Sequence, residues 1–363
     1  MFDSKLIIID FPSWLTITTG FIVSFLITFF GIPSVHKIAR IKNIYDIPGI
    51  RASHDVPIPR LGGTMIFAGI IISSVLFTGL EKSVELKYLI AGLLVLFFIG
   101  LKDDIISLVF FKKAAGQLLA CIILVIFGGI RINLNCDFIG TGEICYVASV
   151  ILTIIITLLL INSLNFIDGI DGLASGVGII ASISFGLWFI LINQVSYAVI
   201  CFSLTGSLIA FFWYNVFSRK YKIFLGDTGS MVIGFLLAVF LIRSLELNYD
   251  NSVFGFSDIA ASLALAILIV PVFDIFRIVF IRILHGKSPF KADHNHIHHQ
   301  VLKLAGSHLK ATCVMLSVNI VLILVVILFR SLGNKILIPS LLLISIVLSL
   351  LLTIYLNNNT HSE

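Results

Sequence analysis

Four short polar segments interrupt an otherwise apolar chain, and they carry the residue types that bind metal ions and phosphates. They are GLKDD at 100–104, NSLNFIDGIDGLASG at 162–176, FLGDTGS at 224–230 and DHNHIHH at 293–299. Acidic side chains beside membrane-spanning segments are costly in free energy and are functional candidates by default. We therefore expect the four segments to form one active site.

The segment 162–172 has the most specific pattern. Asn162, Asn165, Asp168 and Asp171 place a polar oxygen at every third residue, near one side of a helical turn. Oxygen ligands of this kind suit a hard cation such as Mg²⁺ or Mn²⁺. The pattern predicts a divalent metal site, and a polar helix cap is the plainer alternative.

Two further acidic motifs stand at the ends of apolar runs. Asp103 and Asp104 are interpreted as a metal ligand together with a proton acceptor, or as a solvated helix end. Asp227, Thr228 and Ser230 precede another apolar run. One of them is expected to cap that helix at its N-terminus, where free N–H groups also favour a phosphate.

Basic side chains accompany the acidic ones. The histidines of 293–299 are predicted to bind phosphate or substrate, and zinc is less favoured because no cysteine accompanies them. Arg60 and Lys113 are candidates for phosphate contacts, with anchoring at the membrane surface as the alternative for Lys113. Asp274 and Arg277 share one helical face and are expected to form an ion pair that stabilises the helix bundle.

The composition indicates a membrane protein. Of the 363 residues, 59% are hydrophobic and only 12% are charged, whereas soluble domains have about 25% charged residues. Runs long enough to cross a bilayer predict an all-α, polytopic integral membrane protein with about eleven transmembrane helices, ten being the alternative. The expected spans are 14–35, 62–80, 87–101, 114–130, 147–162, 173–192, 195–214, 229–245, 258–281, 311–330 and 335–356.

The distribution of charge predicts the orientation. Most of the 24 basic residues fall in loops on one face, which is therefore expected to be cytoplasmic. The N-terminus is then outside and the C-terminus inside. All four polar segments lie on the cytoplasmic face of a single transmembrane domain, 1–363, within loops 36–61, 102–113, 162–172, 215–228 and 282–310.

Together the residues favour metal-assisted phosphate chemistry at the membrane surface. The scattered basic residues argue against nucleic-acid binding, and no P-loop motif is present to suggest an ATP-driven motor. A transporter would place charges near the bilayer midplane, often in two related halves, and the sequence has no internal repeat. An inactive lipid-binding scaffold would not be expected to keep all of these acidic positions.

The four motifs, in this order, resemble those of the polyprenyl-phosphate N-acetylhexosamine-1-phosphate transferases over about residues 14–330. HIHH at 296–299 and HDVPIPRLGG at 54–63 are most similar to the bacterial undecaprenyl-phosphate GlcNAc-1-phosphate transferase branch. The resemblance implies that undecaprenyl phosphate attacks the β-phosphorus of a UDP-N-acetylhexosamine and releases UMP, assisted by Mg²⁺ or Mn²⁺. It also implies a site on the cytoplasmic face of the bacterial inner membrane, where cell-surface polysaccharide synthesis begins.

The resemblance also implies roles for individual residues. Asp227 and Asn165 would be metal ligands, and Asp168 and Asp171 would lie at the metal and nucleotide. Asp103 and Asp104 would lie near the carrier phosphate, with one removing its proton. The phosphates would be bound by His296, His298 and His299, and the uracil by Asn215. GlcNAc is the default donor sugar, with 6-deoxy or diamino N-acetyl sugars as alternatives. A homodimer is compatible with the sequence, as is a disulfide between Cys136 and Cys145.

Overall fold

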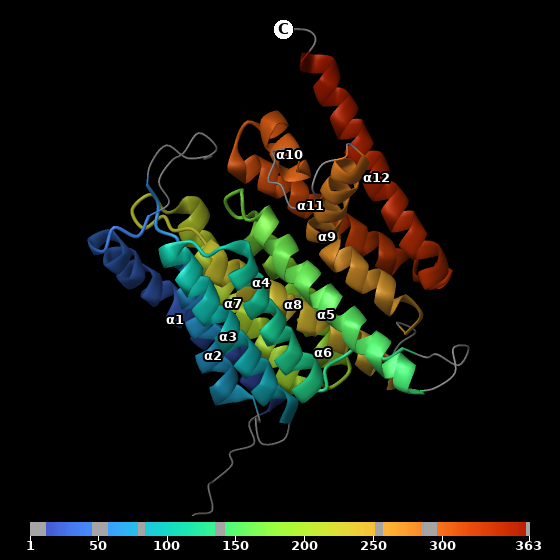
Figure 1. Cartoon of the computed structure of the whole chain (residues 1–363), viewed down its shortest axis with the longest axis horizontal. Helices are drawn as coiled ribbons and strands as arrows, with labels where there is room; N and C mark the ends of the chain where they lie inside the picture. The colour runs from blue at the N-terminus through green and yellow to red at the C-terminus, as the bar shows by residue number, and fades with distance from the viewer. Residues whose placement is uncertain are drawn as a thin grey trace, which may run out of the picture.

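The computed structural model in Figure 1 describes residues 12–45, 57–78, 84–134, 142–250, 257–284, 286 and 296–360. These residues form helices joined by loops, with no β-strand among them. The predicted all-α fold is therefore confirmed. The helices are α1 (Ser13–Ile41), α2 (Gly62–Phe77), α3 (Val84–Ile106), α4 (Phe110–Ile122), α5 (Gly142–Ile167), α6 (Leu173–Leu191), α7 (Val195–Phe212), α8 (Gly226–Asp250), α9 (Ala260–Leu284), α10 (Ile297–Ala305), α11 (His308–Leu328) and α12 (Gly333–Thr360). Helices α4 and α7 continue into π-helical turns, η1 (Ile123–Phe127) and η2 (Trp213–Phe217).

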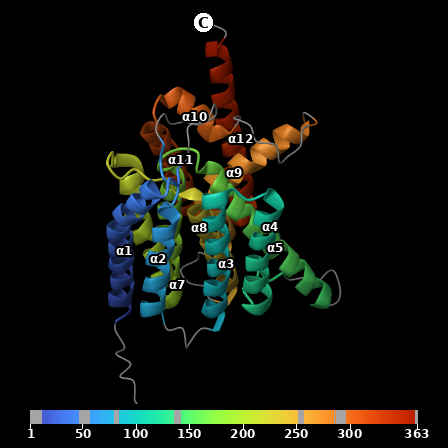
Figure 2. The same cartoon turned by 60° about the vertical axis from the view of Figure 1, so that its left-hand side comes forward.

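Ten helices within the described residues are long and apolar enough to cross a membrane, which confirms a multi-pass membrane protein. The remaining predicted span corresponds to α2, which has only 16 residues. At 1.5 Å per residue this helix is about 24 Å long, shorter than a hydrocarbon core of about 30 Å. It nevertheless packs against α1 and α7 and stands upright between α1 and α3 in Figure 2. The orientation of the termini stays a prediction.

Helix α8 is the centre of the bundle. Every residue from Thr228 to Phe240 is buried. The helix packs mainly against α3 and α5, and it also contacts α2, α6 and α9. A helix that is apolar on all sides is stable only when other helices or lipid surround it. Its N-terminal turn therefore has a place defined by several neighbours at once.

Small residues bring α1, α2 and α7 close together. The Ser73 hydroxyl on α2 donates to the carbonyl of Gly20 on α1 at 2.6 Å and lies 2.8 Å from the Ser203 hydroxyl on α7. The Thr28 hydroxyl on α1 donates to the carbonyl of Met65 on α2 at 3.1 Å. Small side chains allow the close approach, and hydroxyls bond across the interface where no water is available.

Helix α9 contains a proline, and a neighbouring helix compensates for it. Pro271 has no N–H to donate to the carbonyl of Ile267 one turn earlier. The Asn319 amide on α11 donates to that carbonyl at 3.4 Å and to the carbonyl of Ala266 at 2.8 Å. This contact attaches α11 to α9 about two turns before Asp274.

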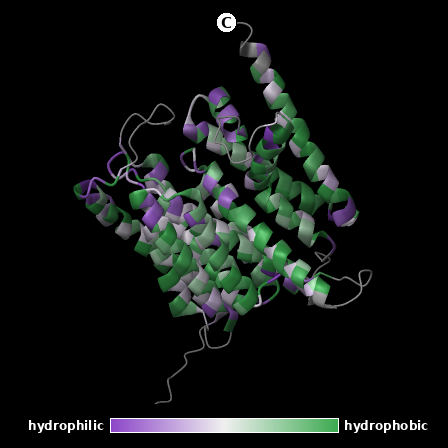
Figure 3. Ribbon diagram, viewed as in Figure 1, coloured by the Kyte–Doolittle hydropathy of each residue, from purple (hydrophilic) through white to green (hydrophobic). Residues whose placement is uncertain are grey.

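Hydrophilic residues gather mainly at the end of the bundle that carries α10, which we call the α10 end (Figure 3). The opposite end has its own charged group, in which Arg243 pairs with Glu85 at 2.7 Å and with Glu246 at 2.6 Å. Cys145 is disulfide-bonded, and Cys136, the partner that the sequence allows, lies outside the described residues.

The close contact between α3 and α8 provides a test of this packing. A methyl group on Gly100 would lie 2.5 Å from the Cα atom of Thr228, which cannot move unless α8 moves. Overpacking of this kind costs about 1–3 kcal/mol, so Gly100→Ala is expected to lower the melting temperature of the detergent-solubilised protein. Gly20→Ala is the control, because its nearest neighbours are side-chain atoms at 3.2–3.4 Å. Equal melting temperatures for the two variants would contradict this packing.

Candidate active site

The carboxylate of Asp104, near the end of α3, caps the N-terminus of α8. It accepts hydrogen bonds from the backbone N–H of Asp227 at 2.6 Å and from the N–H and hydroxyl of Thr228 at 3.0 and 2.5 Å. The predicted cap within 227–230 is wrong, because α8 begins at Gly226 and its cap comes from another helix. The same contact occupies N–H groups that were expected to be open to a phosphate.

Asp227 is the residue on which the other polar groups converge. Its Oδ1 accepts hydrogen bonds from the ammonium of Lys113 and, at 2.6 Å, from the amide of Asn165. The Asn165 amide also reaches the Ser230 hydroxyl at 2.9 Å. The ammonium of Lys113 lies 3.1 Å from Asp103 as well, so one cation bridges two carboxylates from different helices. The structure thus brings together residues of three of the four predicted segments.

The expected helical spacing of segment 162–172 holds only for its first half. Helix α5 ends at Ile167, so Asp168 and Asp171 lie in the turn before α6. Asn162 makes no hydrogen bond with the acidic residues in the described part of the chain and donates to the Gln117 side chain at 3.1 Å. Glycines at the turn release the chain from the helix, and this places the two aspartates differently from Asn165.

Asp171 is paired with residues that the motifs did not reveal. Its carboxylate lies 2.6 Å from the ammonium of Lys222, and its backbone N–H donates to Nδ1 of His308 at 3.2 Å. The Thr312 hydroxyl donates to its carbonyl at 2.8 Å. Lys222 could have been anticipated as a cation in a predicted loop. His308 and Thr312 begin a helix far along the chain, and no local pattern marks them.

Asn215 links two loops of the site. Its side-chain oxygen accepts the N–H of Gly172 at 2.7 Å, and its amide donates to the carbonyl of Ile223 at 3.0 Å. The residue is almost fully buried. Its amide thus holds the 168–172 turn against the loop before α8, and the expected contact with uracil stays a prediction.

The first predicted loop also reaches the site. The backbone of residues 59–63 is hydrogen-bonded to that of residues 224–225. The carbonyl of Arg60 lies 2.1 Å from the position that a methyl group on Gly226 would occupy. Arg60 therefore sits beside the N-terminus of α8, and its charge acts on Asp168.

Helix α10 places the histidines over the 166–169 turn. The ring of His296 stacks on Phe166 with centroids 5.6 Å apart. Ring atoms of His298 and His299 lie 3.4–3.7 Å from the position of a methyl group on Gly169. His294 lies outside the described residues. The fourth predicted segment thus joins the other three at the α10 end.

The expected ion pair between Asp274 and Arg277 is wrong. Asp274 contacts His298 at 2.6 Å and His296 at 3.3 Å, both at Nδ1. Arg277 donates instead to the Thr353 hydroxyl on α12 at 3.1 Å. Two residues on the same helical face can turn toward different neighbours, because tertiary contacts outweigh a weak pairing within a helix.

Asp168 lies among like charges. Desolvation by the surrounding protein raises the pKa of its carboxyl well above the usual value. The carboxylates of Asp227, Asp104 and Asp171 raise this pKa further, whereas Arg60 lowers it. In the described part of the chain no hydrogen-bond donor contacts this carboxylate. Asp168 is therefore the acidic group of the site best suited to hold a proton.

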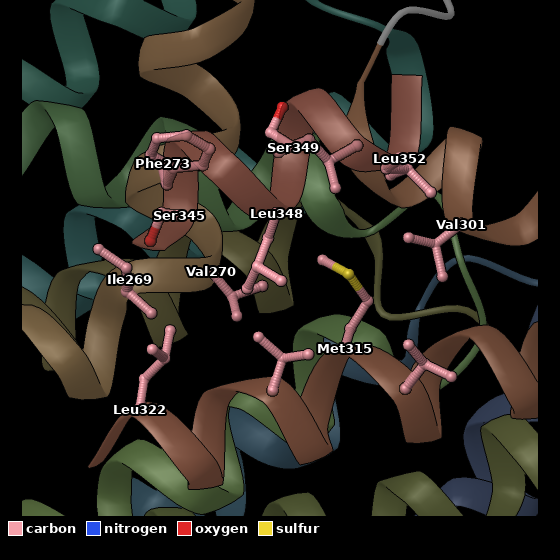
Figure 4. Close-up of a pocket in the computed structure, with 13 residues that line it drawn as sticks. Ile269, Val270, Phe273, Val301, Met315, Leu322, Ser345, Leu348, Ser349 and Leu352 are labelled. Carbon is pink, nitrogen blue, oxygen red and sulfur yellow. The ribbon is translucent and has the colours of Figure 1, made fainter. Parts of the chain in front are cut away.

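An apolar cavity of about 200 Å³ lies beside α10 (Figure 4). It is lined by residues of α9, α10, α11 and α12, among them Phe273, Val301, Met315 and Leu348. None of its lining residues is charged. The hydroxyls of Ser345 and Ser349 are its polar groups, and without a cation the cavity gives a phosphate charge no compensation. We therefore place the chemistry at the histidines of α10.

Comparison with known proteins agrees with this site. The sequence model described as glycosyl transferase family 4 matches residues 86–245. Over 294 residues the chain is 30% identical to the undecaprenyl-phosphate alpha-N-acetylglucosaminyl 1-phosphate transferase of Escherichia coli (strain K12), covering 80% of this chain and 77% of the relative. Over 312 residues it is 31% identical to the decaprenyl-phosphate N-acetylglucosaminephosphotransferase of Mycobacterium tuberculosis, covering 80% and 76%.

These matches define the class, a membrane-embedded transferase. The chain belongs to glycosyl transferase family 4. The family expected from the four motifs is thereby confirmed.

The raised pKa of Asp168 predicts how stability depends on pH. Between the usual aspartate pKa of about 3.9 and the raised pKa, the folded protein keeps a proton that the unfolded chain has lost, so the free energy of unfolding falls as pH rises. Asp168→Asn removes this loss. In EDTA it is expected to raise the melting temperature more at about pH 8 than at about pH 5. Asp258→Asn, at an exposed aspartate near the opposite end, is the control. If Asp168→Asn changed the melting temperature equally at both pH values, the raised pKa of Asp168 would be contradicted.

Proposed function

We propose that this protein transfers GlcNAc-1-phosphate from UDP-GlcNAc to undecaprenyl phosphate and releases UMP. The relatives of E. coli and M. tuberculosis are named for transfer of this sugar phosphate to a polyprenyl phosphate. The observation that carries the proposal is the convergence on Asp227, where carboxylates, an amide and a lysine meet at one end of a membrane bundle. Such a site can accept a soluble nucleotide sugar and a lipid phosphate together.

Asp227 and Asn165 are the residues that we propose to hold Mg²⁺, with Mn²⁺ as an alternative. Both carry side-chain oxygens, which these cations prefer, and the Asn165 oxygen would reach the ion after rotation of the amide that now donates to Asp227. The fit is supported by Lys113, whose ammonium already lies between Asp103 and Asp227, so the surroundings stabilise positive charge at this point. When bound, the ion would offset negative charge on the diphosphate and on the departing UMP.

The surrounding side chains bind the phosphates and hold the turns of the site in place. His296, His298 and His299, with Arg60, lie around the 166–169 turn and are proposed to bind phosphate oxygens. Lys222 keeps the Asp171 turn in place near the nucleotide. An oxygen of the lipid phosphate then attacks the β-phosphorus, and the bond from that phosphorus to the oxygen of UMP breaks.

The four expected catalytic aspartates differ in their freedom to accept a proton. Asp104 accepts three hydrogen bonds at the start of α8, and Asp103 and Asp171 are paired with lysines. Asp168 has a raised pKa and no hydrogen-bond donor among the described residues. We therefore propose that its carboxylate accepts the proton of the incoming lipid phosphate. A phosphate monoester loses its second proton near pH 6, so only weak basicity is needed at neutral pH.

The reaction is proposed to occur at the cytoplasmic face of the bacterial inner membrane, as the initiating step of cell-surface polysaccharide synthesis. A transfer assay on purified protein tests the function. It would contain undecaprenyl phosphate, Mg²⁺ and one of several UDP-N-acetylhexosamines, and would follow UMP and the lipid product. Turnover with UDP-GlcNAc supports the proposal. Turnover only with a 6-deoxy or diamino N-acetyl sugar would change the donor, and no turnover with any donor would refute the proposal.

Removal of the central carboxylate should abolish this activity. Asp227→Ala eliminates the proposed metal ligand and the partner of Lys113 and Asn165, so turnover is expected to fall at least about 100-fold. EDTA should stop the wild-type enzyme, and Mg²⁺ should restore it. Asp258→Asn should retain activity, since Asp258 lies near the opposite end of the bundle. Asp227→Ala protein that is folded and retains substantial turnover would remove Asp227 from the metal site.

The orientation can be tested by labelling introduced cysteines. Lys220→Cys places a thiol in the exposed loop before α8, and Lys335→Cys places one near the start of α12 at the opposite end. Both would be made in Cys313→Ser protein, because Cys313 is exposed and free. A membrane-impermeant maleimide added to intact cells should label only Lys335→Cys. Labelling of Lys220→Cys under these conditions would overturn the proposed topology.

A further inference from the structure

Asp274 makes a buried contact with the histidine helix that the motifs do not explain. Its side chain is about 1% exposed, as is that of His298. One carboxylate oxygen lies 2.6 Å from Nδ1 of His298 and 3.3 Å from Nδ1 of His296. The other accepts the backbone N–H of Ile297 at 2.7 Å. A single carboxylate therefore contacts three successive residues at the start of α10.

We propose that Asp274 is a positioning residue that holds the Nδ1 side of His298, so that Nε2 of His298 is directed at the phosphates of the substrate. This inference rests on the proposed function and extends it to a residue outside the four polar segments.

The geometry determines which nitrogen of His298 is available. Because the Asp274 carboxylate can only accept, Nδ1 must carry the hydrogen of their bond. Nε2 then faces away from α9. It is buried and has no hydrogen-bond partner in the described part of the protein. It lies 3.5 Å from the position that a methyl group on Gly169 would occupy, next to Asp168.

An unpartnered buried nitrogen of this kind costs free energy unless a ligand supplies its partner. A phosphate oxygen can do so when Nε2 carries a proton, and a phosphate O–H can do so when it does not. Gly169 places no side chain between the ring and the turn, so only backbone separates this nitrogen from Asp168. The arrangement fits the phosphate of a nucleotide sugar or of the lipid acceptor.

Two further contacts keep Asp274 in place. Asn319 donates to carbonyls of α9 about two turns before it, where Pro271 withholds a hydrogen bond. Phe166 stacks on His296, and His296 stacks on His298 with centroids 5.1 Å apart. The histidine rings are thus held from both sides.

A metal ion shared by these three residues is the competing interpretation, because their ligand atoms lie within 4.8 Å of one another. Two ligands of a tetrahedral Zn²⁺ at its usual bond lengths would be about 3.3 Å apart. The 3.3 Å between Nδ1 of His296 and Asp274 matches this spacing. The 2.6 Å between Nδ1 of His298 and Asp274 is too short for two ligands of one ion and is that of a short hydrogen bond to a carboxylate. The geometry therefore favours direct positioning.

The test uses Asp274→Asn, with Asp274→Glu as the conservative variant and Arg277→Gln as a control on the same helix. Nitrogen NMR of ¹⁵N-histidine protein in nanodiscs, with His298→Gln to assign the signal, should show an Nδ1-protonated His298. That signal should change in Asp274→Asn only. In the transfer assay Asp274→Asn should raise KM by about 10-fold or more for the substrate whose phosphate contacts His298, with a smaller effect on kcat. Asp274→Glu should recover part of this loss.

Three results would overturn the inference. One is an unchanged His298 signal in folded Asp274→Asn protein. Another is a loss of kcat alone with no rescue by Asp274→Glu. The third is one zinc per chain, found by elemental analysis of the wild type and lost in Asp274→Asn. If the wild type shows no turnover with any donor, the proposed function fails, while the NMR signal still decides whether Asp274 positions His298.

Discussion

The cap that Asp104 provides for α8 is the interaction on which the rest of the site depends. A buried carboxylate at the end of a membrane helix is tolerated only where donors surround it, and the unpaired N–H groups of a helix N-terminus are such donors. The contact locks the end of α3 to the start of α8. Gly100 permits it, because any side chain there would meet the backbone of Thr228. Asp227 occupies the first turn of α8, so its place is determined by a residue from another helix.

Balance of charge is the second requirement. Several carboxylates meet at the α10 end, and desolvation together with repulsion from its neighbours raises the pKa of Asp168. Lys113 and Lys222 offset part of this charge through direct pairs with Asp227 and Asp171. A cluster that mixes partly compensated carboxylates with lysines and histidines can hold cations and anions at once. That property suits a reaction between two phosphate-bearing substrates.

Local patterns predicted the helices and the participants well, but not their partners. Long apolar runs identified the spans, because the bilayer imposes one length on every crossing helix. The acidic residues were identified as functional because their burial in a membrane is costly. Asp274 was assigned the wrong partner, and His308 was not considered. Their partners lie 24 and 137 residues away along the chain, so no local spacing marks these pairs.

The sequence by itself determined an all-α membrane bundle, its family and the four segments that make the site, since hydrophobic length and motif order are local properties of the chain. Only the tertiary structure decided how each group is used. It assigned Asp104 to capping, Asn215 to linking two loops and Asp274 to the histidines. Those roles depend on which helix ends meet, and that follows from packing around α8 rather than from any spacing along the chain.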